Sequence, residues 1–153
     1  MNDTNINDTN ILAALIQKKH ECLGQLCALG RQQKELIDAA DMTSLLDVLA
    51  VKQRVLLELQ RMEQLTTPYR NQTPEERQWS SPELRERCAR QLQECEQLFQ
   101  EIVRQEQESE QELIQRRDEA ARQIECFQQT RQVSVAYTAP SPNTGGLDLS
   151  SDG

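Results

Sequence analysis

Few side chains in this chain are suited to acid–base or metal chemistry. The only histidine, His20, lies in a charged stretch from residue 18 to 21. His20 with Cys22 or Cys27 could supply two of the four nitrogen or sulfur ligands of a structural zinc ion, but the other ligands would have to come from other helices. We therefore interpret His20 as a surface or groove-edge side chain, and we predict neither a metal site nor a cofactor.

The five cysteines are odd in number, form no Cys-x-x-Cys pair and mostly occupy apolar positions of a helical pattern. Cys88 and Cys95 are seven residues apart, which places both on one face of a helix. This spacing is typical of a core stripe, and a thiol pair is the alternative. We predict reduced cysteines that serve as small core side chains. They are Cys22, Cys27, Cys88, Cys95 and Cys126.

The arginines do not form the pattern of an enzyme pocket. Small all-helical enzymes such as chorismate mutases gather Arg and Lys around a dianionic substrate inside a bundle. Here the arginines alternate with Glu and Gln on faces away from the apolar stripe, as in a solvated helix face with charge pairs. We predict no catalytic residue and no enzymatic activity. The arginines concerned are Arg85, Arg87, Arg90, Arg116, Arg117 and Arg122.

The composition favours protein partners over nucleic acid or membrane. Asp and Glu number 25 against 17 Lys and Arg, and the net charge of -8 repels phosphate backbones and anionic headgroups. No apolar run reaches the roughly 20 residues of a membrane span, and the first ten residues lack the basic and apolar regions of a signal peptide. We expect a cytosolic protein with no membrane insertion. An aromatic content of 3% and a mean hydropathy of -0.74 favour a slender helical bundle.

The apolar periodicity predicts three helices. After a frayed polar lead over residues 1–10, apolar residues recur at intervals of three and four over 11–39 and again over 42–66. Asp41 can cap the second helix. We favour a tight antiparallel turn before it, because only folding back buries both stripes; a continuous helix through this region is the alternative. A third helix is predicted over 81–131, and a flexible tail over 132–153.

The third helix is predicted to be the longest, since no Gly or Pro follows Pro82 before residue 131. At about 1.5 Å per residue it would measure roughly 75 Å, against roughly 40 Å for each of the others, so one end should project. Its stripe lapses from Arg104 to Glu112, which separates a proximal half that can complete a three-helix core from a distal half that cannot be covered. The proximal stripe consists of Leu84, Cys88, Leu92, Cys95, Phe99 and Ile102.

These patterns predict an all-α fold: an antiparallel three-helix bundle or coiled coil with an extended third helix and a flexible C-terminal tail. The distal half carries apolar residues at core-like spacing and so predicts a partner-binding stripe. The alternative is a second copy of the same helix in a dimeric coiled coil, so we expect a monomer or a weak homodimer. Tyr137 in the tail could form a short docking motif. The stripe consists of Leu113, Ile114, Ala120, Ala121, Ile124 and Phe127.

The middle of the chain resembles the FlgN-type flagellar export chaperones. The resemblance rests on a long first helix, the runs Leu36-Ile37-Asp38-Ala39-Ala40-Asp41 and Leu45-Leu46-x-x-Leu49-x-x-Lys52-Gln53-x-x-Leu56-Leu57-Glu58-Leu59, a long third helix and a loose tail. It covers most of residues 11–131 in layout. The chain departs from the family in its Gly-Gly-Leu-Asp-Leu ending and in the loop around Trp79.

The resemblance implies a cytosolic chaperone of flagellar type III export. Such a protein binds the C-terminal helices of hook-filament junction (hook-associated) proteins, prevents their premature assembly and delivers them to the export gate. The family's client site corresponds here to Leu113 through Phe127. Its gate-docking tyrosine corresponds by position to Tyr137. The alternative function is a structural homodimeric coiled-coil scaffold.

Overall fold

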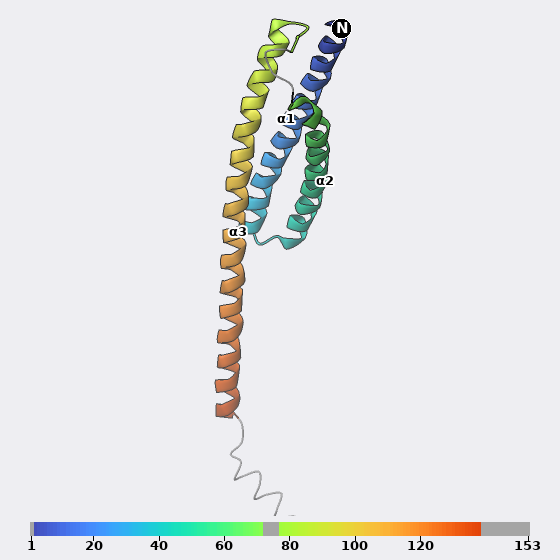
Figure 1. Cartoon of the computed structure of the whole chain (residues 1–153). Helices are drawn as coiled ribbons and strands as arrows, with labels where there is room; N and C mark the ends of the chain where they lie inside the picture. The colour runs from blue at the N-terminus through green and yellow to red at the C-terminus, as the bar shows by residue number, and fades with distance from the viewer. Residues whose placement is uncertain (1, 72–76, 139–153) are drawn as a thin grey trace, which may run out of the picture. The chain divides into compact units, whose positions relative to one another are not determined.

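The computed structural model describes residues 2–71 and 77–138, and the side chains from residue 5 onward (Figure 1). It consists of α1 (Asn2–Asp38), α2 (Met42–Thr66), the 3-10 turn η1 (Thr67–Tyr69) and α3 (Pro82–Thr138). The predicted all-α class is confirmed. The chain divides between Glu112 and Leu113 into two compact units, which are described separately below.

The helices at both ends are longer than the sequence predicted. α1 begins at Asn2 instead of residue 11, and α3 continues to Thr138 instead of residue 131. The first turns of α1 are held by tertiary hydrogen bonds, because the Thr9 hydroxyl donates to the Gln78 carbonyl at 2.6 Å and the Asn5 side-chain oxygen accepts from the Gln78 amide at 3.2 Å. The predicted tail is therefore helical up to Thr138, and its remainder, residues 139–153, lies outside the described residues.

The predicted antiparallel turn is confirmed. Ala40 adopts a left-handed backbone conformation with a φ of 56°. The Asp41 amide donates to the Leu36 carbonyl at 3.0 Å, which satisfies a carbonyl at the end of α1 in the manner of a Schellman motif. The Asp41 carboxylate then accepts from the Ser44 amide at 3.1 Å and caps α2. Two consecutive caps at one short connection stop α1 and start α2 in the opposite direction.

The cap predicts an acid-dependent contribution to stability. Hydrogen bonds from the Ser44 side chain and backbone hold the pKa of Asp41 below its ordinary value. Because the pKa is lower in the folded chain, the carboxylate stabilises the fold above its unfolded pKa, and this contribution is lost as the pH falls through the folded value. We expect Asp41→Asn, which still caps, to lose less stability than the wild type between pH about 7 and about 3. Urea unfolding at both pH values measures this; equal losses would contradict it.

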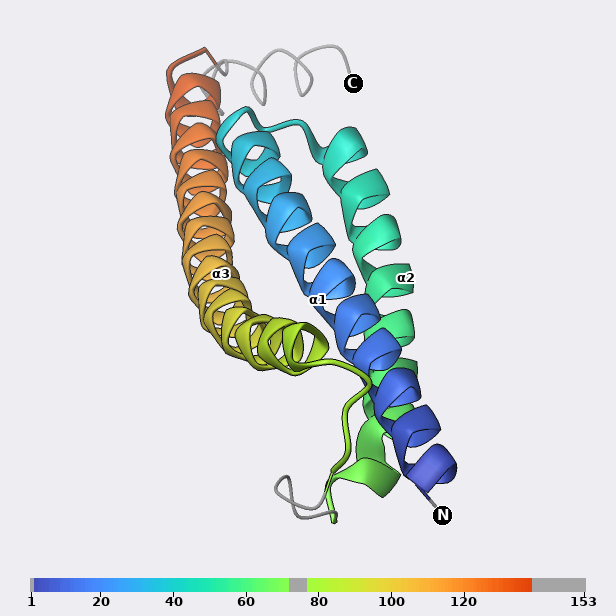
Figure 2. The same ribbon diagram turned by 90° about the horizontal axis from the view of Figure 1, so that it is seen from above.

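Within residues 2–112, α1 lies between α2 and α3 (Figure 2). Its contacts with α3 run in parallel order, from His20 with Glu94 to Lys34 with Glu108. One core cluster joins all three helices, and a second joins α1 to α3 with Tyr69, Trp79 and Leu84 at its edge. The buried members of the two clusters are Leu23, Leu26, Cys27, Cys95 and Ile102 in the first, and Leu12, Ala13, Ile16 and Cys88 in the second.

The core continues through the stretch of α3 that has no apolar residue. Gln105 and Ser109 are buried, and the Gln105 amide nitrogen donates to the Cys27 carbonyl at 3.0 Å. Lys52 of α2 is also buried; it donates to Gln33 at 2.8 Å and pairs with Glu106. Burial lowers the pKa of Lys52. The lapse in the apolar pattern is therefore a polar layer of the bundle, and it does not mark the end of the core.

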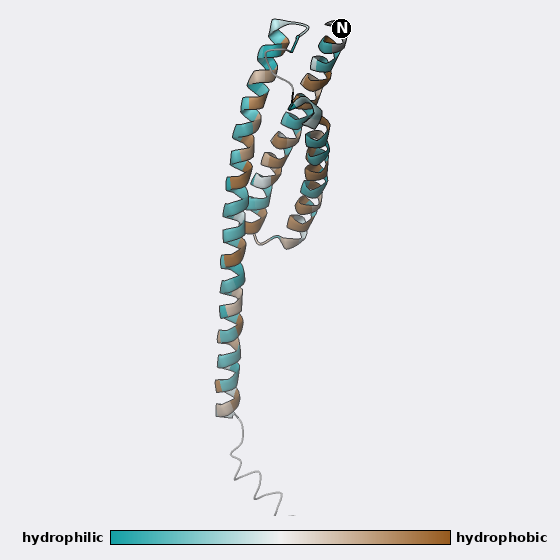
Figure 3. Cartoon of the chain, viewed as in Figure 1, coloured by the Kyte–Doolittle hydropathy of each residue, from teal (hydrophilic) through white to brown (hydrophobic). Residues whose placement is uncertain are grey.

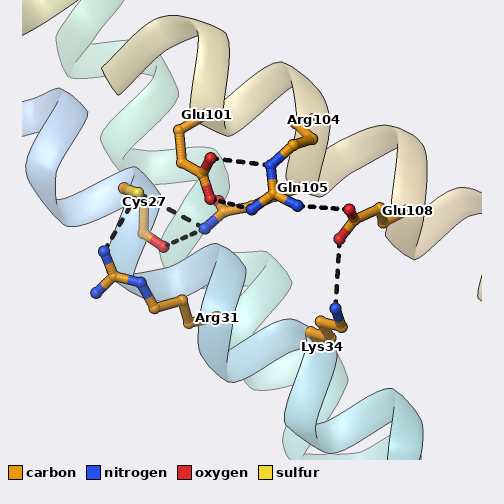
Figure 4. Close-up of polar contacts among 7 residues, drawn as sticks. All are labelled: Cys27, Arg31, Lys34, Glu101, Arg104, Gln105 and Glu108. Atoms are coloured by element: carbon orange, nitrogen blue, oxygen red, sulfur yellow. Dashed lines mark hydrogen bonds and ion pairs between the residues drawn. The ribbon is translucent and has the colours of Figure 1, made fainter. Parts of the chain in front are cut away.

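Charged side chains surround this layer on the α1–α3 side (Figure 4). Arg104 donates to Glu101 at 2.9 Å and to Glu108 at 2.5 Å, and Glu108 accepts from Lys34 of α1 at 3.3 Å. The hydrogen bonds between Arg104 and Glu101 raise the pKa of the arginine and lower that of the carboxyl. Since these groups are exposed, we regard the network as a guide to helix register and not as a main source of stability.

The two glycines of α1 provide a matched test of the packing of Gln105 against α1. A side chain at Gly24 would meet nothing within 4 Å, whereas a Cβ at Gly30 would lie 2.1 Å from the side-chain oxygen of Gln105. Gly24→Ala should stabilise the fold by up to about 1 kcal/mol through helix propensity. Gly30→Ala has the same intrinsic gain but displaces a buried, hydrogen-bonded amide, so it should be less stable than Gly24→Ala by about 1–3 kcal/mol. Chemical denaturation measures the difference, and adding Gln105→Ala should reduce it; equal stabilisation by both alanines would contradict the packing.

Several residues predicted for the core stripes are exposed instead. Leu92 and Phe99 of α3 are 46% and 57% exposed, and α2 leaves Leu46, Leu49 and Leu56 exposed. The prediction was wrong at these positions, because α2 and α3 bury the faces that meet α1, which lies between them, and these residues stand beside those faces. Figure 3 shows how apolar and hydrophilic residues alternate along α2 and α3.

Candidate partner-binding surface

The second unit consists, in its described part, of the helical residues 113–138. Every side chain from residue 117 to 138 is exposed. The exposed side chains of residues 113–138 include large apolar ones, which a binding partner would cover. These are Ile114, Ile124, Phe127, Val133, Val135 and Tyr137.

The sequence-predicted stripe maps onto two adjoining rows of this helix. At about 100° per residue, Leu113, Ala120, Ile124 and Phe127 lie within roughly 60° of one another, and Ile114 and Ala121 form a second row about 80–100° from Leu113. Leu113 is half-buried and both alanines are exposed. Ile114, Ile124 and Phe127 are 41%, 59% and 69% exposed. The helix thus gathers all six predicted residues on one broad face.

Tyr137 is separate from this face. It is 86% exposed and belongs to α3, not to a flexible tail. Helical geometry places it roughly 110° around the axis from the first row, and Val133 roughly 150°. Sequence reasoning missed Val133 and Val135 as helical surface residues. The signal that could have found them is the absence of Gly and Pro up to Thr138.

The charge of this segment differs from that of the whole chain. Residues 113–138 contain four arginines and three carboxylates, which gives +1, whereas the chain carries -8. Two of the arginines, Arg117 and Arg131, fall close to the first apolar row at helical spacing. A partner seated on this face would therefore meet apolar side chains interrupted by positive charge.

The cysteines differ sharply in exposure. All five are free thiols; Cys22, Cys27, Cys88 and Cys95 are buried and Cys126 is exposed. Burial raises the pKa of the Cys22, Cys88 and Cys95 thiols, which lowers their thiolate fraction at neutral pH. The predicted core role holds for four cysteines and is wrong for Cys126, which is exposed and lies about 130° around the helix from the first apolar row.

This pattern predicts one fast thiol and four slow ones. With Ellman's reagent at pH about 8 the native chain should react rapidly at a single cysteine, and Cys126→Ser should abolish the fast phase, because only the thiolate attacks the reagent. All five should react in denaturant. A fast phase of two or more thiols in the native chain would contradict the burial of the other four.

The remaining candidates form no metal-binding group within the described residues. His20 is partly exposed, and its Nε2 lies 2.7 Å from a carboxylate oxygen of Glu94. Residues 5–71 and 77–138 contain no group of three or more His, Cys, Asp or Glu placed to hold a metal ion. The six arginines named from the sequence are exposed, except that Arg116 is half-buried.

Comparison with models of protein families, with curated proteins and with solved structures finds no match for this chain. Among the described residues, no helix is both long and apolar enough to cross a membrane.

Proposed function

We propose that this protein is a cytosolic chaperone of flagellar type III export. In this role it binds the C-terminal helices of hook-filament junction proteins, keeps them from assembling early and delivers them to the export gate. The observation that carries the proposal is the apolar face of residues 113–127, on which Ile114, Ile124 and Phe127 are 41–69% exposed. The layout and sequence runs that resemble FlgN-type chaperones support it.

The physical basis is cover of one amphipathic helix by another. Junction-protein helices that pack together in the assembled filament expose apolar stripes before assembly, and such stripes aggregate in water. Burial of four large side chains, Leu113, Ile114, Ile124 and Phe127, would contribute about 6–12 kcal/mol before association and ordering costs. This is enough for a specific complex that can still release its client.

Tyr137 is the proposed contact with the export gate. It lies on another side of the helix from the first apolar row, so both contacts could form at the same time. An exposed aromatic ring with a polar tip is a frequent anchor in protein interfaces. We expect Tyr137→Ala to weaken binding to the gate and to leave client binding unchanged.

A homodimeric coiled-coil scaffold is the second candidate. The observation that favours it is the seven-residue spacing of Leu113, Ala120 and Phe127, which matches one position of a heptad. The other core position of that heptad would fall on Arg117, Ile124 and Arg131. Two arginines in a dimer core are unfavourable, so we rank this function below the chaperone.

A thiol placed on the proposed face provides the test. In the variant Ile124→Cys with Cys126→Ser, we expect purified hook-filament junction protein to slow maleimide labelling at residue 124 at least about tenfold, because this position lies in the first apolar row. Cys126 of the wild type lies about 130° around the helix from that row, so its labelling should slow much less. Bovine serum albumin at the same concentration serves as the control and should not slow labelling at residue 124. Unchanged labelling with junction protein, together with slow labelling that depends on the concentration of the chain itself, would favour the scaffold.

A further inference from the structure

The first unit contains an apolar groove that the proposed function does not use. A cavity of about 440 Å³ is lined by residues of α1, α2 and α3, among them Leu23, Leu59, Cys95 and Phe99. A second cavity of about 180 Å³ shares Lys19 and Leu92 with the first, so the two form one groove. Its size lies in the range of ligand-binding pockets.

The smaller end of the groove is basic. Lys19, Arg70 and Arg77 line it together with the apolar residues Leu12 and Ile16. Glu63 is the carboxylate that balances part of this charge, since it pairs with Lys19 at 2.5 Å and with Arg70. Three cations and one carboxylate leave a local excess of positive charge in a chain whose net charge is -8.

Arg77 is the cation with unused hydrogen-bonding capacity. Its Nη2 donates to the Tyr69 carbonyl at 2.6 Å, which fixes the guanidinium at the end of the groove. Its Nε is buried and has no hydrogen-bond partner in the described part of the chain. A buried donor without a partner is destabilising, and a carboxylate oxygen at this end would accept its hydrogen bond.

The apolar rim selects the size of the occupant. Leu92 and Phe99 of α3 line the groove and are 46% and 57% exposed. A thin acyl chain would leave these side chains in water, whereas a helix about 10 Å wide would cover them. The C-terminus of such a helix carries the negative end of its dipole and the α-carboxylate, which matches the basic end.

We propose that this groove binds the carboxyl-terminal turns of an amphipathic helix from a partner protein. The terminal carboxylate lies against Arg77 and Arg70, and the apolar face packs on Leu23, Leu59 and Phe99. The bound helix runs in the direction of α2 and completes a four-helix arrangement. This site lies within residues 12–99 and does not depend on the surface at residues 113–127, so either can fail without the other.

The test uses the full chain and a synthetic 18-residue helical peptide with leucines at positions i, i+3, i+4 and i+7. One batch ends in a free carboxylate and the other in a carboxamide. Trp79 is the only tryptophan and packs at the edge of the core cluster beside this end of the groove, so its fluorescence reports binding. We expect the carboxylate form to bind about tenfold more tightly, because a charge-assisted contact is lost in the amide.

Two variants test whether the preference for the carboxylate peptide arises at this site or from the charge of the chain in general. Arg77→Gln should remove the preference for the carboxylate form, while Arg54→Gln, an exposed α2 residue that does not line the groove, should keep it. Circular dichroism confirms that each variant is folded. Equal affinity of both peptide forms for the wild type, absence of peptide binding, or binding of palmitate alone would each overturn the proposal.

Discussion

Leu26→Ala is expected to destabilise the fold by about 3 kcal/mol, within the range of about 2–5 kcal/mol for a buried leucine. Leu26 is 1% exposed and lies in the cluster that joins α1, α2 and α3. Removal of its side chain leaves a cavity bordered by all three helices, which cannot collapse without shifting one of them. Urea unfolding followed by circular dichroism measures the loss.

The matched control is Leu46→Ala. Leu46 has the same side chain and belongs to the predicted apolar pattern of α2, but it is 67% exposed. The variant should lie within about 0.5 kcal/mol of the wild type, as substitutions away from the core do. If both alanine variants lost similar stability, the assignment of the core to the α1-facing sides of α2 and α3 would be wrong.

The second large effect concerns function. The double variant Ile124→Asp with Phe127→Asp should weaken binding of a junction-protein helix at least about a hundredfold, because two large apolar contacts are lost and two charges would have to be desolvated. The stability of the first unit should not change, since both side chains are already exposed. Isothermal titration against the purified junction protein measures the affinity.

Val133→Asp is the control for that experiment. Val133 is 55% exposed on the same helix but points about 150° away from the first apolar row. It introduces the same charge into the same segment and should reduce affinity less than about threefold. Comparable losses in the control and the double variant would mean that binding depends on the charge of the segment and not on the face.

Local signals in the sequence predicted the framework of the fold. Asp41 was identified as a cap from its position before an apolar run, and the cap is present because its carboxylate reaches the Ser44 amide. The apolar spacing of α1 was equally informative, since α1 is covered on two sides and every residue of its stripe is buried or half-buried. Residues such as Leu23 and Leu26 therefore follow from periodicity alone.

Properties that depend on tertiary arrangement did not follow from periodicity. Leu92 and Phe99 have core-like spacing, yet they are exposed because α1 lies between α2 and α3. Gln105 and Ser109 are polar and nevertheless buried, and no hydropathy pattern distinguishes them from solvent-facing glutamines. The burial of Gln105 depends on Gly30, whose lack of a side chain leaves room for the Gln105 amide.

The two candidate sites also differ in how far the sequence alone predicts them. The apolar face at residues 113–127 could be predicted, because its residues lie on one helix and share its period. The basic end of the groove could not, since Lys19, Arg70 and Arg77 come from α1 and from the connection between α2 and α3. Only the folded chain brings these three cations to one place.

The molar mass in solution tests the central proposal most directly. Light scattering after gel filtration of the chain alone, and of the chain with purified hook-filament junction protein, separates a chaperone from a scaffold. We predict a largely monomeric chain and a defined complex that the double variant Ile124→Asp with Phe127→Asp does not form. A stable dimer that forms without a partner and gains no mass with junction protein would contradict it.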